Sequence, residues 1–407
     1  MKIGVVSIVS EIQAEERIDK TLEDKYQVLE ENFELEEIEA DEIPYTDFSN
    51  YDLTINFIKS GGSESIFAEN VQYLPQPVYL LATDLHNSLP AALEILSFLN
   101  AEGLSGKILH GEIEELAAEI RELAAYKKVR DSIAAARLGV IGKPSDWLIG
   151  SQVDYEHASH HWGTEFVDIE LDEIYRALEK VDSAKAKRIA ADFLENAAAI
   201  VESNKADLVE ASKIYLALKE VITDKDLDAL TIRCFDIVME LNTTGCLALA
   251  LLNNEGLVSG CEGDIPAAFT MFLAHQLTGE MPFMANPAAI DKNKDEILFA
   301  HCTVATDISS DYIIRSHFET GIGVGIQGIL EKGPVTVFKI GGAGLEQYFV
   351  AEGEIIENMD SPNACRTQLK ISLPQSSDYF LNDAIGNHHL IIPGYHADKI
   401  NEFLGME

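Results

Sequence analysis

Apolar residues in the first part of the chain fall in short runs, and longer polar stretches with helical spacing separate them. The runs at residues 2–9, 51–58 and 77–82 have the length of buried strands. The stretches at 87–99 and 112–133 carry the apolar spacing and the Ala, Leu and Glu content of helices. Strands that alternate with helices predict βαβ units and a parallel sheet.

A second block of the same kind begins at residue 136. Residues 136–142 and 163–169 are predicted strands, and an apolar segment at 243–252 leads to a further strand at 257–259. Between them the pattern predicts helices over residues 172–181, 183–202, 205–219 and 225–240. The middle of the chain is therefore a second α/β block.

The pattern changes to short strands with Gly-rich turns from about residue 297. The predicted strands are 297–305, 323–330, 335–340, 346–356, 367–371 and 384–392, before a last short helix at 397–404. Successive short strands with turn signals favour an antiparallel barrel or sandwich. We therefore predict three domains, at residues 1–134, 135–296 and 297–407, with a terminal helix that can pack elsewhere.

Charge narrows the classes of partner. The chain of 407 residues has a formal net charge of −39. Such a surface repels phosphate backbones and anionic lipids, which argues against nucleic-acid and membrane partners. A neutral substrate such as a sugar is compatible with it, and so is a charge that reflects only solubility or a salty habitat.

The beginning of the chain and its cysteines indicate a cytoplasmic protein. Residues 2–9 are followed closely by acidic residues and read as a first strand, not as a secretory signal. No apolar run approaches the roughly 18 residues that span a bilayer. The five cysteines form an odd set without a CxxC pair, so we expect reduced thiols.

The most informative motif is residues 260–270, GCEGDIPAAFT. It places Glu262 where a probable strand ends, and the carboxyl end of such a strand faces the crevice in which α/β proteins bind ligands. Asp264 stands just before Ile265 and Pro266, which is an ordinary helix start with Asp as the N-cap. We therefore favour a functional role for Glu262 and capping for Asp264.

Histidines at the ends of other predicted strands complete a candidate metal site. His301 ends one strand, and His388 and His389 precede another, where alternation sends adjacent side chains to opposite faces. His317 is a further candidate. A carboxylate with separated imidazoles suits a hard divalent cation such as Mn²⁺, although a lone histidine after apolar residues is more often a core residue. A separate histidine cluster fits no metal motif and is assigned to the surface or an interface: His157, His160 and His161.

These segments, taken together, resemble the L-fucose/L-arabinose isomerase superfamily, and most closely its L-fucose isomerase-like branch. The matching segments follow one order over nearly the whole chain: NSLPAALE at 87–94, GKPSDWLI at 142–149, CEGD at 261–264, HC at 301–302, HFETG at 317–321, GPVT at 333–336 and GNHH at 386–389. The resemblance implies two Rossmann-like α/β domains followed by an antiparallel β-barrel-like domain. It also implies a homo-oligomer, a trimer or hexamer, with active sites completed by a neighbouring subunit.

The reaction that the resemblance implies is aldose–ketose interconversion, an intramolecular oxidoreduction, with Mn²⁺ or a similar cation and a cis-enediol intermediate. By this resemblance Glu262 is a metal ligand and proton shuttle. His388 matches the C-terminal metal histidine, with His389 as the alternative, and His301 matches a further ligand. The residues assigned to substrate binding are Asn87, Ser145, Asp146, Trp147 and His317.

One position departs from the family pattern. Asn286 stands where the second carboxylate is expected, as both a metal ligand and a catalytic group. An amide oxygen can bind a cation, but it cannot act as a general base. We therefore keep two hypotheses: a metal-dependent sugar isomerase for a neutral monosaccharide, or a carbohydrate-binding relative without turnover. The sequence does not name the sugar.

Overall fold

The computed structural model describes residues 1–10, 15–374 and 377–405. The chain separates into two compact units, one made of Met1–Arg130 together with the terminal residues from Glu402, the other of Asp131–Asn401. The three domain boundaries drawn from the sequence stay predictions. The predicted fold class is confirmed, since parallel α/β sheets are followed by a closed antiparallel barrel.

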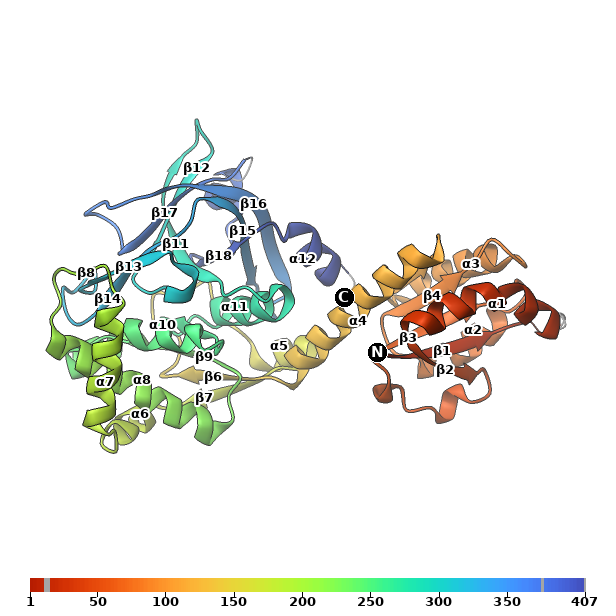
Figure 1. The fold of residues 1–407 in the computed structure, drawn as a ribbon, viewed down its shortest axis with the longest axis horizontal. Helices are drawn as coiled ribbons and strands as arrows, with labels where there is room; N and C mark the ends of the chain where they lie inside the picture. The colour runs from red at the N-terminus through yellow and green to blue at the C-terminus, as the bar shows by residue number, and fades with distance from the viewer. Residues whose placement is uncertain (11–14, 375–376, 406–407) are drawn as a thin grey trace. The chain divides into compact units, whose positions relative to one another are not determined.

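The first unit is built on a parallel sheet in the order β2-β1-β3-β4-β5 (Figure 1). Its strands are β1 Lys2–Ile8, β2 Glu34–Glu39, β3 Leu53–Ile58, β4 Val78–Ala82 and β5 Gly106–Leu109. β3 and β4 are buried along their whole length, which explains their continuous apolar sequences. The sheet confirms the predicted βαβ pattern of this part of the chain.

Helices cover this sheet. They are α1 Glu15–Asn32, α2 Glu64–Asn70, α3 Ser88–Glu102 and α4 Ile113–Ala135, with short 3-10 turns η1 Ile43–Tyr45, η2 Phe48–Asn50 and η3 Val71–Tyr73. α2 and α3 share an apolar core with β1, β3 and β4, in which Phe67 and Ile95 contact the strands. α3 ends at Gly103, whose left-handed conformation (φ +72°) closes the last turn.

The second unit begins with another parallel sheet, in the order β10-β9-β6-β7. Its strands are β6 Arg137–Ile141, β7 Glu165–Ile169, β9 Ala229–Ile232 and β10 Ser259–Cys261. The predicted helix at 225–240 is wrong in its first half, because Ala229–Ile232 pairs with both β6 and β10 as a fully buried central strand, whereas the second half is helical from Cys234. A strand of this length carries no periodicity that separates it from a buried helical turn.

The helices of the second unit are α5 Tyr155–Trp162, α6 Leu171–Leu178, α7 Ser183–Glu195, α8 Lys205–Lys225, α9 Cys234–Leu241, α10 Cys246–Asn254 and α11 Ile265–Thr278. α8 starts with a capping box, in which the Asn204 side chain accepts from the Asp207 backbone and Asp207 accepts from the Asn204 backbone. α11 is buried along almost its whole length. It packs between the parallel sheet and the barrel strands β15 and β18.

The barrel closes in the order β11-β12-β17-β16-β15-β18 (Figure 1). Its strands are β11 Phe283–Asp291, β12 Glu296–His301, β15 Gly333–Gly341, β16 Gln347–Asn358, β17 Thr367–Ser372 and β18 His389–Pro393. A small sheet flanks it, made of β8 Ala199–Ile200, β13 Asp311–Arg315 and β14 Gly325–Ile329. The short helices of this region are η4 Thr306–Ile308, η5 Tyr379–Asp383 and α12 Ala397–Leu404.

One apolar core joins the barrel to the helices of the second unit. Phe283 and Phe299 of the barrel belong to the same buried cluster as Phe193 of α7 and Leu247 of α10. The barrel therefore packs directly against the α/β layer, and residues at its strand ends are held in a fixed position relative to that layer. Within the described residues, no helix combines the length and apolarity needed to cross a bilayer.

Candidate metal centre

The order of the parallel sheet in the second unit explains where a ligand site forms. β6 lies between β7 and β9, so the chain changes direction across the sheet between β6 and β9. In such sheets the loops after the carboxyl ends of the central strands diverge and leave a crevice. The loop after β6 carries Ser145 and Trp147, Arg233 follows β9, and Glu262 follows β10.

The backbone holds Glu262 in a left-handed conformation with φ of +62°. Its carbonyl accepts a hydrogen bond from Ser145 N at 3.0 Å, which ties the β10 loop to the β6 loop. A Cβ atom on the next residue, Gly263, would lie 2.4 Å from Lys143 O, so only glycine fits there. Residues with side chains held in this conformation concentrate at functional sites.

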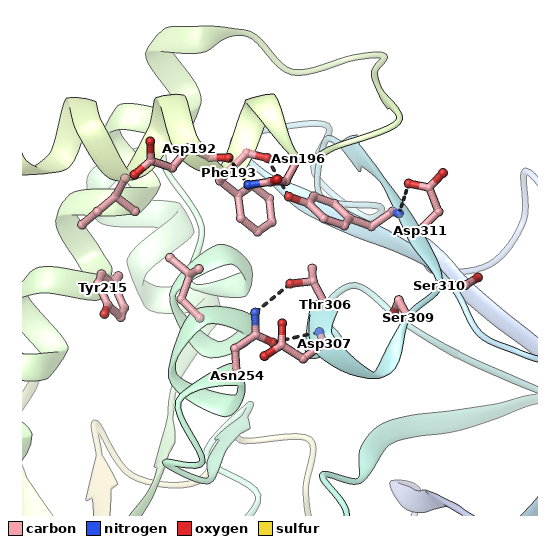
Figure 2. A pocket seen from close by; sticks show the side chains of 13 residues that line it. Asp192, Phe193, Asn196, Tyr215, Asn254, Thr306, Asp307, Ser309, Ser310 and Asp311 are labelled. Carbon is pink, nitrogen blue, oxygen red and sulfur yellow. Dashed lines mark hydrogen bonds between the residues drawn. The ribbon is translucent and has the colours of Figure 1, made fainter.

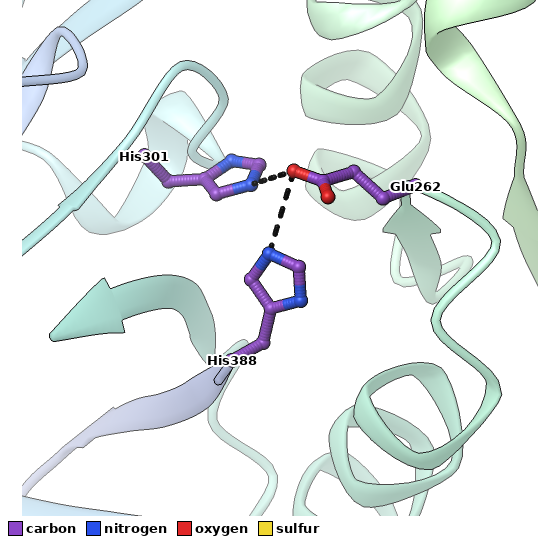
Figure 3. A group of neighbouring side chains, drawn as sticks. All are labelled: Glu262, His301 and His388. Atoms are coloured by element: carbon purple, nitrogen blue, oxygen red, sulfur yellow. Dashed lines mark ion pairs between the residues drawn. The ribbon is translucent and has the colours of Figure 1, made fainter. Parts of the chain in front are cut away.

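Two histidines from the barrel point at this carboxylate (Figure 3). His301, at the end of β12, places Nε2 3.8 Å from Glu262 Oε1, and His388, just before β18, places Nε2 3.5 Å from the same oxygen. One ligand atom from each of the three residues lies within 4.8 Å of the other two. The structure therefore brings together Glu262, His301 and His388 from three segments that are far apart in the sequence.

The other side of His388 is fixed by Asp264. His388 Nδ1 lies 2.8 Å from Asp264 Oδ2, and Asp264 Oδ1 accepts from Ala267 N at 2.8 Å as the N-cap of α11. The predicted capping role of Asp264 is confirmed. Because the Nδ1–H of His388 donates to Asp264, the Nε2 atom is the one left to face Glu262.

Lys339 of β15 lies behind Asp264 and is fully buried. Its Nζ is 3.8 Å from Asp264 Oδ1 and has no hydrogen-bond partner among the described residues. Burial lowers the pKa of Lys339, although the negative charge of Asp264 acts to raise it. Burial also opposes ionisation of Asp264, but Lys339 and His388 outweigh it and hold the pKa of that carboxyl below its usual range.

Burial and neighbouring charges also have opposite effects on the pKa values of Glu262 and His388. Burial disfavours ionised Glu262, yet His301 and His388 outweigh it, and the pKa of Glu262 lies below its usual range. Burial also disfavours a charged His388, but Asp264 and Glu262 raise the pKa of His388 to about 9. Glu262 is thus a carboxylate at neutral pH, with its charge directed at the two imidazoles.

His389 faces the opposite side of β18, as strand alternation predicts. Its Nε2 is 3.0 Å from Tyr379 Oη, and its ring packs against Phe349 and Phe380. Burial lowers the pKa of His389 to about 3, so the ring is neutral. Of the adjacent pair, His388 is the residue that faces Glu262.

An aromatic wall lies beside the carboxylate. Trp147 donates from Nε1 to Glu262 Oε2 at 2.7 Å, and the Trp147 side chain remains 49% exposed. Phe235 packs edge-on between Trp147 and His317, with ring centroids 5.0 and 5.3 Å away. Three residues assigned to the substrate side therefore lie near Glu262: Ser145, Trp147 and His317.

The other substrate-side residues are placed differently. Asp146 is exposed and pairs with Arg233 at 2.9 Å, so its carboxylate is engaged at the rim. Asn87 belongs to the first unit, where it is the N-cap of α3 with φ of +57°. Its assignment to the sugar stays a prediction.

Asn286 of β11 supports the loop that carries His388. Its Oδ1 accepts from Asn387 Nδ2 at 3.1 Å, and Asn387 Oδ1 in turn accepts from His388 N at 2.8 Å. An amide oxygen has a second lone pair, so this contact leaves room for a further bond. A metal-binding or catalytic role of Asn286 stays a prediction.

The donor set fits a divalent cation. One carboxylate and two imidazoles suit Mn²⁺-class or Zn²⁺-class ions. His388 Nε2 is buried and lacks a hydrogen-bond partner within the described part of the chain, which is costly for a polar atom unless something binds it. An ion between the three donors would satisfy that atom.

The sequence did not predict a role for Lys339 or Phe235. For Asp264 it predicted helix capping but not the contact with His388. Lys339 had a signal, since it is a charged residue within the strand sequence VTVFKIG, which is otherwise almost entirely apolar. Phe235 had none, because an aromatic residue in an apolar helix reads as core. The histidines assigned to the surface, His157, His160 and His161, all lie exposed on α5.

A separate pocket of about 440 Å³ lies between α7, α10 and the segment from Thr306 to Tyr312 (Figure 2). Its titratable lining residues are Asp192, Asp307, Asp311, Tyr215 and Tyr312. It shares no residue with the Glu262 cluster. Among the described residues, its three aspartates do not bring ligand atoms together as the Glu262 cluster does, so it does not compete as the metal centre.

Fold and site define a mixed α/β and β-barrel protein in which the two layers jointly hold a carboxylate and two imidazoles. No family model matches the chain. Sulfoquinovose isomerase of Alkalicoccus urumqiensis is 24% identical over 331 residues, which cover 78% of this chain and 73% of that protein. The chain spans about half the length of two other proteins of that name. The protein from Clostridium sp. (strain MSTE9) is 28% identical, and the match covers 48% of its length. The protein from Priestia aryabhattai is 23% identical, and the match covers 51% of its length.

Proposed function

We propose that this protein is an aldose–ketose sugar isomerase that acts on a neutral monosaccharide with a hard divalent cation of the Mn²⁺ class. One observation carries the proposal: Glu262 Oε1 faces the Nε2 atoms of both His301 and His388, from different layers of the fold. The relatives named sulfoquinovose isomerase support the sugar-isomerase class.

Glu262, His301 and His388 would hold the cation, with Asp264 fixing the orientation of His388. A bound cation of this kind polarises the substrate carbonyl as a Lewis acid. Imidazole and carboxylate ligands with a buried second-sphere carboxylate are a common arrangement at such centres.

Glu262 is also the group best placed to move the proton. In the isomerisation a proton leaves C2 of the aldose and returns to C1, through a cis-enediol. The hydroxyl proton on O2 is transferred to O1 in the same conversion. The low pKa of Glu262 keeps it a carboxylate before the reaction, as a base requires. Its two oxygens have separate surroundings, since Oε1 faces the histidines and Oε2 accepts from Trp147.

The surroundings in the second unit favour a neutral sugar. Trp147 offers an exposed aromatic face of the kind that packs against a sugar ring. Arg233, which follows β9 at the rim, is held by Asp146 and Asp236 at 2.9 and 3.0 Å, so its charge is already compensated. A sulfonated sugar, as in the names of the relatives, would need a free cation instead.

Asn286 favours the second hypothesis, a carbohydrate-binding protein without turnover, because an amide in place of a second carboxylate leaves Glu262 as the single base. The two functions separate in one assay. Chelator-stripped protein is supplied with Mn²⁺ and incubated with a panel of neutral aldoses and with sulfoquinovose, and ketose is quantified by chromatography.

We expect ketose from at least one neutral aldose in wild type and none from Glu262→Gln. Conversion of sulfoquinovose alone would refute the neutral-sugar assignment. If no sugar is converted, yet a sugar raises the melting temperature, the binding function replaces the enzyme.

A further inference from the structure

A second group of potential ligands lies next to the metal centre and shares no residue with it. Cys302, Glu319 and Cys365 each offer one ligand atom, and these atoms lie within 4.8 Å of one another. They come from three loops of the second unit: the end of β12, the turn after β13 and the loop before β17. Since Cys302 follows His301 directly, one strand end supplies a donor to each group.

The spacing of the donors suits a tetrahedral ion. Two ligands at Zn–S and Zn–O bond lengths of about 2.0–2.3 Å are roughly 3.5–3.8 Å apart in a tetrahedron. Cys365 Sγ lies 3.9 Å from Glu319 Oε1. Cys365 Sγ donates to that oxygen, and Cys302 Sγ lies within 4.8 Å of both atoms. Only small side-chain shifts separate this arrangement from a coordinated one.

The chemistry of this group differs from that of the Glu262 centre. Thiolates prefer soft or borderline ions such as Zn²⁺ and Cd²⁺, whereas Mn²⁺ prefers oxygen and imidazole. Cys302 is buried, whereas the Glu319 side chain is 46% exposed, so an ion has a route to the thiols.

We propose that Cys302, Cys365 and Glu319 form a second metal site, selective for a thiophilic divalent cation of the Zn²⁺ class. Three protein ligands leave the fourth position to water. Glu319 Oε2 lies 3.3 Å from His317 Nε2, so an ion here touches a carboxylate that contacts the candidate substrate residue His317. The proposal does not rest on the isomerase function.

Cadmium binding to the reduced full-length protein tests this site without an activity assay. Chelator-stripped protein is kept in a non-thiol reductant and titrated with Cd²⁺, and the ultraviolet thiolate-to-cadmium charge-transfer band is recorded. The Glu262 centre contains no thiolate, so cadmium bound there does not produce the band. We expect the band to saturate at one equivalent in wild type and competing Zn²⁺ to remove it.

Matched variants locate the ligands. Cys365→Ser should lose most of the band, and Glu319→Gln should weaken cadmium affinity about tenfold or more, as loss of a ligand does. Cys246→Ser and the exposed Glu331→Gln serve as controls that keep the band, and melting curves verify folding. Absence of the band in wild type, or an unchanged band in Cys365→Ser, would overturn the proposal. An equal loss in Cys246→Ser would also overturn it.

Discussion

His388 Nδ1 lies 2.8 Å from Asp264 Oδ2, although the two residues are 124 positions apart in the sequence. This hydrogen bond links the first turn of α11, in the α/β layer, to the start of β18 in the barrel. The same carboxylate caps the helix through Oδ1. One side chain thus begins a helix, orients a candidate metal ligand and joins two layers of the second unit.

Asp264→Asn separates these roles, because asparagine also caps helices but does not carry the charge that orients His388. We expect Mn²⁺ affinity to fall about 10- to 100-fold, measured by isothermal titration calorimetry. The matched control is Asp154→Asn, which changes the N-cap of α5 outside the site. Equal Mn²⁺ affinity in Asp264→Asn and wild type would show that the carboxylate does not support the ligand.

Asn286→Asp tests whether β11 contributes to the centre. A carboxylate in this position keeps the acceptor for Asn387 and adds a negative charge beside the loop of His388. We expect Mn²⁺ to bind about tenfold more tightly, a gain of ~1.4 kcal/mol. An unchanged or weaker affinity would place Asn286 outside the metal centre.

Trp147→Phe keeps an aromatic ring and removes the Nε1 donor to Glu262. A hydrogen bond to a charged group is worth about 1.5–3 kcal/mol, so we expect kcat/KM to fall roughly 10- to 100-fold. Trp162→Phe is the matched control, since Trp162 donates to Leu345 O away from the site. The control should lower stability and leave turnover unchanged. Steady-state kinetics with undiminished kcat/KM in Trp147→Phe would contradict a role for this bond.

Glu202 and Arg315 form a pair whose contribution depends on pH. Their hydrogen bonds at 2.5 and 2.7 Å, together with a backbone donor, lower the pKa of Glu202 to about 2 from 4.5. A depressed carboxyl pKa stabilises the fold above the unfolded value near 4.5, and this contribution disappears as pH falls toward 2.

We therefore expect Glu202→Gln to lower the free energy of unfolding by about 1–2 kcal/mol at pH 7, after allowing for solvent screening of a partly exposed pair. The difference from wild type should shrink steadily below pH 4.5. Urea unfolding at several pH values measures it, with the exposed Glu179→Gln as control. A difference independent of pH would mean that the ion pair is not its source.

The sequence predicts the fold class because buried strands and amphipathic helices leave local patterns. The site was predictable only where its residues end such elements, as Glu262, His301 and His388 do. β9 was not predicted because Ala229–Ile232 is too short to show the alternation of a strand. The contact between Lys339 and Asp264 could not be foreseen either, since it depends on how α11 packs against β15.

Replacing each of the adjacent histidines tests the central claim most directly. His388 faces Glu262, whereas His389 faces Tyr379. Calorimetric titration of Mn²⁺ into folded His388→Gln and His389→Gln protein therefore compares a ligand with its neighbour. We expect His388→Gln to lose Mn²⁺ binding by about 100-fold or more while His389→Gln retains it. Retained binding in His388→Gln, or equal loss in both variants, would contradict the account.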